Sequence, residues 1–333
     1  MDTKRLPRIA AAVAAFGFCL SALAQQPVVM KFNSPAPPRS YLHEVFTPWA
    51  AAVSESSGGT VKIEMLFGGT LGNFGVTYDR VVDGVADMGF ILTGLAGGKF
   101  RQHDVAALPF EARTSLSAAT ALWKMYEKGV TAGEFDAVRP LAIWTFPNAA
   151  LNSKVQVKNL DDLKGKKIAT ANAIIARIVG ALGAAQVTMR PDEMYQGVSR
   201  GVVDMALMQF TGVATFKLNE VARFHLDVAL GGDAAMIIIS KKRWDALPPQ
   251  AKAAFEKHSN LALSEKLGQA SDAEWVRSRG TLQNVSTLSA QEEAQWKKLV
   301  TPVVDQWVRD TPGGAKALET FRAEIKAFEA KAK

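Results

Sequence analysis

Two aspartates stand in nearly the same sequence context, and a pair of carboxylates can act together as a general acid and a general base. Asp87 lies in D-G-V-A-D-M-G-F (residues 83–90), and Asp204 lies in R-G-V-V-D-M-A-L (residues 200–207). Each follows a short amphipathic stretch and a glycine that ends a helix, and each precedes an apolar run typical of a buried strand. Because the two aspartates occupy equivalent places, we interpret them as a repeated structural feature rather than a catalytic pair.

The other residue types that catalyse reactions or bind metals are dispersed along the chain. The four histidines have no second ligand at metal-binding spacing: His43, His103, His225 and His258. We interpret them as surface residues or as hydrogen-bonded core residues. The sequence contains no H-E-x-x-H, G-x-S-x-G or Walker A motif and no G-x-G-x-x-G in the context that binds dinucleotides. We therefore expect a binding protein that is not an enzyme and needs no cofactor and no metal.

The N-terminus predicts a secretory signal peptide over residues 1–24. Three basic residues precede an apolar stretch from Ile9 to Leu20, and an A-x-A cleavage signal occupies residues 22–24. The apolar stretch is short for a transmembrane helix. The one cysteine, Cys19, lies in this segment, so the mature chain is expected to have no disulfide and no thiolate site.

Charge gives little indication of a macromolecular partner. The first 24 residues carry three basic side chains and one acidic side chain, so cleavage lowers the formal net charge from +7 to +5. The basic residues are scattered, and no basic run is interleaved with aromatic residues. We therefore expect no nucleic-acid partner.

Helices and strands alternate through most of the mature chain. The run from Val28 to Leu92 reads as β-α-β-α-β, which favours a parallel, doubly wound sheet. A second α/β lobe begins near Pro147 and contains the second G-V-x-D-M unit. Two lobes of related build enclose a cleft, and clefts bind small molecules. We assign residues 25–147, with part of about 234–270, to the first lobe, and residues 148–233 to the second.

The last part of the chain, residues 271–333, predicts long helices that pack across the lobes. Ser289 and Glu292 form the S-x-x-E capping box that begins one of them. Apolar residues then recur at three- and four-residue spacing from Trp296 to Val308. We interpret this stripe as a core-packing face, with a partner-binding surface as the alternative.

Several short strings occur in an order and spacing that identify a family. They are G-G-T-V-K-I-E (58–64), G-T-L-G (69–72), D-G-V-A-D-M (83–88), L-P-F (108–110), N-S-K (152–154), L-D-D-L-K-G-K-K-I (160–168), L-G-A (182–184), G-V-V-D-M (201–205) and W-D-A-L-P-P (244–249). With them the chain resembles the solute-binding proteins of tripartite ATP-independent periplasmic (TRAP) transporters, the dicarboxylate-binding-protein family. The resemblance implies a two-lobed, periplasmic-binding-protein-like α/β fold with the ligand cleft between the lobes.

The same resemblance implies the biological role. We expect an extracytoplasmic, periplasmic and monomeric receptor that binds a small organic acid, which could be aromatic or otherwise atypical. The receptor is expected to close on this ligand and deliver it to the TRAP permease subunits in the membrane. The alternative is a periplasmic ligand-binding partner of a membrane sensor kinase.

Two departures from the family pattern concern the ligand carboxylate. The resemblance implies two arginines, which pair with that carboxylate through the planar guanidinium. Their positions hold Ala169 and Asn148. Because a buried carboxylate without a partner is costly, either another cation replaces them or the ligand needs none. Arg39 and Arg190 are the candidates, whereas Arg177, in an apolar helix, is expected to reach solvent.

Further candidate ligand contacts lie in the same predicted loops and strand ends. The aromatic candidates are Phe67, Phe90, Trp144 and Phe210, and the polar candidates are Asn148, Asn172 and Gln209. The alternative for the aromatic residues is core packing, and for the polar residues it is a turn or helix-cap role.

Overall fold

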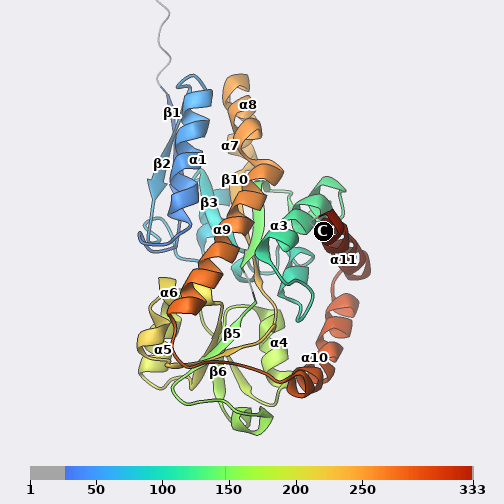
Figure 1. Ribbon diagram of the computed structural model, residues 1–333. Helices are drawn as coiled ribbons and strands as arrows, with labels where there is room; N and C mark the ends of the chain where they lie inside the picture. Colours follow the sequence, from blue (N-terminus) through green and yellow to red (C-terminus); the bar gives the residue numbers. More distant parts are fainter. Residues whose placement is uncertain (1–26, 147, 332–333) are drawn as a thin grey trace, which may run out of the picture.

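The computed structural model describes residues 27–146 and 148–331, which form two α/β lobes joined by long helices (Figure 1). Each lobe contains one β-sheet. The predicted signal peptide and Pro147 lie outside the described residues. In the part of the chain that is described, no helix is long and apolar enough to cross a membrane.

The first lobe is built on a five-stranded sheet of order β2-β1-β3-β10-β4. Its strands are β1 (Val28–Asn33), β2 (Val61–Leu66), β3 (Met88–Leu92), β4 (Val138–Phe146) and β10 (Asp233–Ser240). Strands β1, β2 and β3 are parallel, as the β-α-β-α-β pattern predicts. The sheet is mixed overall, because β10, which lies outside the run that gave this pattern, returns from the second lobe and pairs antiparallel with β3 and β4.

The second lobe is built on a six-stranded sheet of order β11-β9-β5-β8-β6-β7. Its strands are β5 (Ala150–Ser153), β6 (Lys167–Thr170), β7 (Ala185–Thr188), β8 (Met205–Met208), β9 (Phe224–Asp227) and β11 (Val285–Thr287). Strand β6 is parallel to β7 and β8, whereas β5 is antiparallel to β8 and β9. Strand β11 lies in the C-terminal segment, which the sequence predicted as mostly helical.

Helices cover both sheets and connect them. They are α1 (His43–Ser56), α2 (Thr77–Val82), α3 (Ser115–Glu127), α4 (Ala173–Ala181), α5 (Pro191–Ser199), α6 (Phe210–Thr215), α7 (Lys241–Asp245), α8 (Pro249–His258), α9 (Asn260–Thr281), α10 (Ala290–Asp310) and α11 (Gly314–Lys331). Short 3₁₀ turns are η1 (Thr93–Leu95), η2 (His103–Ala107), η3 (Ala132–Glu134), η4 (Leu160–Leu163) and η5 (Leu218–Glu220). Helix α9 runs along both lobes, packing on α3 and β4 in one and on α6 in the other (Figure 1).

The C-terminal helices continue around the molecule. Helix α10 packs on α4 of the second lobe, and α11 packs on α3 of the first. The predicted capping box of Ser289 and Glu292 begins α10. Trp296, Val300, Val303 and Trp307 of the predicted apolar stripe are buried, whereas Leu299 is exposed. The stripe is therefore a packing face.

The two repeated aspartates perform the same structural task in the two lobes. Asp87 accepts a 2.7 Å hydrogen bond from the backbone N–H of Lys31, and Asp204 accepts one of 2.8 Å from the backbone N–H of Lys167. The backbone N–H of each aspartate donates in return to the carbonyl of the same lysine. Each aspartate thus ties the start of its own strand to a neighbouring strand, which confirms the structural interpretation.

Candidate functional site

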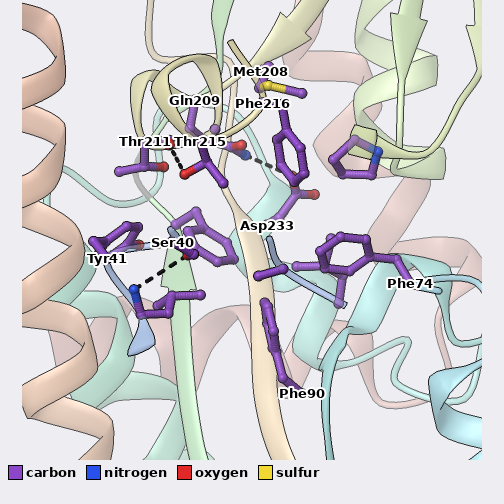
Figure 2. A pocket seen from close by; sticks show the side chains of 16 residues that line it. Ser40, Tyr41, Phe74, Phe90, Met208, Gln209, Thr211, Thr215, Phe216 and Asp233 are labelled. Atoms are coloured by element: carbon purple, nitrogen blue, oxygen red, sulfur yellow. Dashed lines mark hydrogen bonds between the residues drawn. The ribbon is translucent and has the colours of Figure 1, made fainter. Parts of the chain in front are cut away.

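A pocket lies between the lobes, with walls supplied by both (Figure 2). It encloses about 470 Å³ of space outside the protein atoms, part of it continuous with solvent. The first lobe contributes Ala36, Ser40, Tyr41, Leu42, Phe74, Phe90, Leu92, Phe146 and Asp233. The second lobe contributes Pro191, Met208, Gln209, Thr211, Gly212, Thr215 and Phe216. A ligand of this pocket therefore contacts both lobes at once.

Aromatic rings form most of the apolar wall. Phe74 stands edge-on to Phe90, with ring centroids 5.7 Å apart, and edge-on to Phe216 of the other lobe at 6.3 Å. Phe90 also lies 6.3 Å from Phe146. Strand β3 carries Phe90, and the end of α6 carries Phe216, so the fold brings the rings together from four separate segments. Such a wall suits a flat, apolar ligand.

The polar centre of the pocket is a carboxyl group. Asp233, the first residue of β10, is partly buried, and Gln209 Nε2 donates to its Oδ2 at 2.7 Å (Figure 2). Burial raises the pKa of Asp233, and the amides of Gln209 and Asn172 oppose that shift. Of the described residues that line the pocket, Asp233 alone has a charged side chain, since none of them is arginine, lysine or histidine.

Sequence reasoning did not identify Asp233, although its context contains a signal. It follows Gly231-Gly232 and begins a run of buried apolar residues, where an acid is unusual. At Gly231, φ is +92° and a Cβ atom would lie 2.1 Å from the Ala107 carbonyl oxygen. The glycines therefore let the chain pass close to η2, and β10 then pairs Asp233 with Phe146 of β4. This pairing places the carboxyl on the pocket wall.

A second acid, Asp104 of η2, lies behind this wall. Thr93 donates a 2.9 Å hydrogen bond to its Oδ1. Burial, together with the charges of Glu134 and Asp233, raises the pKa of Asp104 to about 7. Asp104 does not line the pocket, but the mutual repulsion with Asp233 makes the negative charge on either acid less favourable.

Hydroxyl groups form a second polar edge of the pocket. Tyr41 shares a 2.9 Å hydrogen bond with Ser271 of α9, and Thr215 donates to the Thr211 carbonyl at 2.7 Å. The Ser40 hydroxyl oxygen accepts the backbone N–H of Leu42 at 3.4 Å, which leaves its hydrogen available to a ligand. The four hydroxyl residues come from both lobes: Ser40, Tyr41, Thr211 and Thr215.

Two of the predicted ligand-binding residues line the pocket, namely Phe90 and Gln209. Trp144 lies directly behind Phe90, with ring centroids 5.3 Å apart, and it is completely buried. The structure therefore places Trp144 in the core that supports the aromatic wall.

The predicted replacement arginines are outside the pocket lining. Arg39 is exposed, although its neighbours Ser40 and Tyr41 line the pocket. Arg190 precedes α5 and pairs with Asp192 at 3.2 Å and with Glu193 at 2.7 Å. Its guanidinium is thus occupied by acids of its own helix. Arg177 reaches Asp310 of α10 at 2.9 Å and is half-exposed, in line with its expected orientation.

The two positions that the family pattern gives to arginine also lie away from the pocket lining. Ala169 is buried in β6 among the apolar residues of the second lobe. Asn148 donates to the Ala112 carbonyl at 3.0 Å and lines a separate small recess. Asn172 caps α4 by accepting the N–H of Ile174 at 2.7 Å. The buried Nδ2 of Asn172 lies near Asp233 but has no hydrogen-bond partner.

The remaining candidates have packing roles. Phe67 packs on His43 with ring centroids 3.9 Å apart, and the completely buried Phe210 packs on Trp275 at 5.6 Å.

Two of the four histidines form hydrogen bonds with polar side chains of the core. His43 bonds to Ser34 at 3.2 Å, and His225 bonds to Asn152 at 2.7 Å.

The other two histidines also contact side chains of the protein. His103 Nδ1 pairs with Glu134, whereas its buried Nε2 has no hydrogen-bond partner, and His258 bonds to Ser56 at 2.6 Å. Burial lowers the pKa of His225 to about 4, which keeps this core imidazole neutral at pH 7. Among the described residues, no group of three or more His, Cys, Asp or Glu side chains is placed to hold a metal ion.

Comparison with known proteins gives the context of this pocket. The family model of the bacterial extracellular solute-binding proteins, family 7, matches residues 32–310. A relative from Comamonas testosteroni, named outer membrane transporter protein TsaT, is 26% identical over 98% of this chain and 99% of its own length.

Two solved structures resemble this one over nearly the whole chain. A TRAP solute-binding protein from Rhodoferax ferrireducens, in complex with copurified benzoate, has a TM-score of 0.87 and 27% identity, covering 92% of this chain and 100% of its own. A TRAP periplasmic solute-binding protein from Bordetella bronchiseptica, with bound mandelate, has a TM-score of 0.83 and 25% identity, covering 91% and 100%.

Proposed function

Because the chain belongs to family 7 of the bacterial extracellular solute-binding proteins, we propose that it is a TRAP receptor for a small aromatic organic acid. The observation that carries this proposal is the aromatic wall of the pocket between the lobes. Its four rings, Phe74, Phe90, Phe146 and Phe216, form a chain in which neighbouring ring centroids lie 5.7–6.3 Å apart. An aromatic ring packs against such surfaces better than an aliphatic dicarboxylate does.

The similar proteins support the same ligand class. One solved structure holds benzoate and another holds mandelate, and both ligands combine one aromatic ring with one carboxylate. The pocket differs from a simple carboxylate clamp, since its described lining has hydroxyl and amide donors in place of a cation. Such donors contribute to orienting a small acid, because hydrogen bonds to a charged group are stronger than those between neutral groups.

Ligand capture works by joining the two lobes. Seven of the lining residues belong to the second lobe and nine to the first, so a ligand gains its full set of contacts only when the lobes approach each other. A ligand shifts an equilibrium toward the state in which it makes more contacts. The loaded, closed protein then delivers the acid to the TRAP permease in the membrane.

The proposal is tested with the purified mature chain and three acids. Benzoate and mandelate should raise the melting temperature and bind with 1:1 stoichiometry in calorimetry. Cyclohexanecarboxylate is the matched control, because it has a similar size and one carboxylate but no aromatic face, and it should bind about tenfold more weakly. Equal affinity for the aromatic and the saturated acid would contradict the role of the aromatic wall.

Closure is tested separately by small-angle scattering. Saturation with the acid that binds should reduce the radius of gyration, as expected when two lobes close on a ligand. A ligand confirmed by calorimetry that leaves the scattering curve unchanged would contradict the closure mechanism.

The same proposal includes the location of the receptor, its oligomeric state and the chemical fate of its ligand. The receptor acts in the periplasm after removal of residues 1–24, works as a monomer and releases its ligand chemically unchanged. Mass spectrometry of the secreted protein should find Gln25 as its first residue, and sedimentation should give the mass of one chain. Acid recovered after prolonged incubation should be identical to the acid that was added.

A further inference from the structure

The position of Asp233 restricts which part of an acidic ligand can approach it. Its carboxyl faces the pocket, and Gln209 is its hydrogen-bond donor at 2.7 Å. A ligand carboxylate beside it would place two negative groups together in a largely apolar space, and the described lining supplies no cation to offset them. We therefore expect the ligand carboxylate to lie elsewhere in the pocket.

The hydroxyl edge offers that place. The Ser40 hydroxyl accepts the Leu42 N–H and keeps its own hydrogen for a ligand. Thr211, from the facing lobe, lines the same pocket. Hydroxyl groups donate well to a carboxylate and need no charge to do so.

The Asp233 carboxyl is held in a fixed orientation toward the ligand. Its backbone pairs with Phe146 in the sheet, and its Oδ2 receives the Gln209 amide. An ionised carboxyl accepts about four hydrogen bonds through its two oxygens, so acceptor positions remain that face the ligand. A ligand without a donor at this point would leave a desolvated acceptor unpaired, which is unfavourable.

We propose that Asp233 is the specificity-determining residue of this pocket, and that its carboxyl accepts a hydrogen bond from a hydroxyl or amino group on the aromatic ring of the ligand. The preferred ligand is then an aromatic acid with two polar ends, a carboxylate that meets the hydroxyl edge and a ring donor that meets Asp233. This inference rests on the proposed function and adds the second polar group of the ligand.

The first experiment compares ligands on the unmodified protein by calorimetry at one pH. Benzoate is the reference, and the ring-substituted series is 2-, 3- and 4-hydroxybenzoate and 3-aminobenzoate. At least one substituted acid should bind about tenfold to a hundredfold more tightly than benzoate. If benzoate binds as tightly as every substituted acid, the proposal is overturned.

The second experiment uses Asp233→Asn. This variant keeps the size of the side chain and an acceptor oxygen for Gln209, but it presents an N–H₂ donor in place of a carboxylate oxygen. The preference for the ring-substituted acid over benzoate should fall by about tenfold or more. Asp305→Asn is the matched control, because Asp305 is an exposed acid of α10 outside the pocket lining, and this variant should keep the preference for the ring-substituted acid over benzoate. A preference retained in Asp233→Asn would overturn the proposal.

Failure of this inference is distinguishable from failure of the proposed function. If benzoate binds tightly and ring donors add nothing, the receptor function stands and the role of Asp233 is refuted. If phenol and benzylammonium bind while none of the acids does, the acid class is refuted, and loss of that binding in Asp233→Asn supports the role of Asp233 alone.

Discussion

Gln209 Nε2 donates a 2.7 Å hydrogen bond to Asp233 Oδ2, and this bond joins the end of β8 in the second lobe to the start of β10 in the first. Both residues line the pocket. A single side-chain contact therefore spans the cleft at the point where the ligand is expected to bind. It couples the position of the Asp233 carboxyl to the approach of the two lobes.

Replacing Gln209 by Leu should weaken ligand binding. The substitution removes the donor to Asp233 and leaves the carboxyl unpaired in the closed protein, which costs about 1–3 kcal/mol. Affinity for an aromatic acid should fall about tenfold, measured by calorimetry. Gln196→Leu on the exposed face of α5 is the matched control and should bind normally. Equal affinities for the two variants would show that the contact has no role in binding.

Replacing Phe216 by Ala should remove the second lobe's part of the aromatic wall. Phe216 stands edge-on to Phe74 of the first lobe at 6.3 Å. An aromatic pair contributes about 0.5–1.5 kcal/mol beyond area burial, so affinity for an aromatic acid should fall by about twofold to tenfold from the lost ring contact, and further from the lost apolar burial. Val202→Ala is the control at an exposed position of the same lobe. A variant that binds cyclohexanecarboxylate and benzoate as the unmodified protein does would contradict the expected role of Phe216.

Asp104 should make the protein less stable as the pH rises. Its folded pKa is about 7, above the ordinary value of 3.8, so the folded protein binds a proton more tightly than the unfolded chain does. This contribution to stability is complete below about pH 4 and is lost as the pH rises through 7. Asp104→Asn does not titrate, so its melting temperature relative to the unmodified protein should increase between pH 5 and pH 8.

The size of that increase follows from the size of the molecule. Each kcal/mol shifts the melting temperature of a domain of this class by about 2–4 °C, and a few degrees are expected. Asp305→Asn, at an exposed position of α10, is the control and should show no such trend. If the difference in melting temperature between Asp104→Asn and the unmodified protein stays constant from pH 5 to pH 8, the raised pKa of Asp104 is contradicted.

Two glycines of α9 should respond in opposite directions to alanine. A Cβ atom at Gly268 would lie 2.8 Å from the Cα of Leu116, where α9 crosses α3, whereas a Cβ atom at Gly280 would meet no atom within 4 Å. Alanine is favoured over glycine in a helix by about 1 kcal/mol, so Gly280→Ala should stabilise the protein by up to about that amount. Gly268→Ala should destabilise it by about 1–3 kcal/mol, because the helices must move apart. Denaturant unfolding measures both, and stabilisation by Gly268→Ala would contradict the close helix contact.

Local signals in the sequence predicted much of the scaffold. Gly84 and Gly201 adopt φ of +78° and +72° after their helices, and Ser289 and Glu292 form the predicted capping box. The equivalence of Asp87 and Asp204 is also visible without a structure, because both lie in the repeated G-V-x-D-M segment, although their partners Lys31 and Lys167 are 56 and 37 residues away. The helix ends and the capping box are set by residues close together in the chain, so sequence spacing is enough to find them.

Which residues line the pocket depends on contacts between segments far apart in the sequence, and sequence spacing does not reveal these contacts. Phe90 was identified on a predicted strand that leads into a loop, and Gln209 was identified because it follows a predicted strand. Arg39 lies in the expected loop and is exposed, whereas its neighbours line the pocket. In a loop without a periodic pattern, the direction of each side chain is set by tertiary packing.

Asp233 shows most clearly that sequence spacing does not predict which side chains face the pocket. The sequence by itself determined the two-lobed family scaffold and the absence of arginine at positions 148 and 169. Only the tertiary structure decided that an acid, and no cation among the described lining residues, faces the ligand space. The physical reason is that β10 pairs antiparallel with a strand nearly ninety residues earlier, Asp233 opposite Phe146. Long-range strand pairing, rather than any local motif, positions that carboxyl.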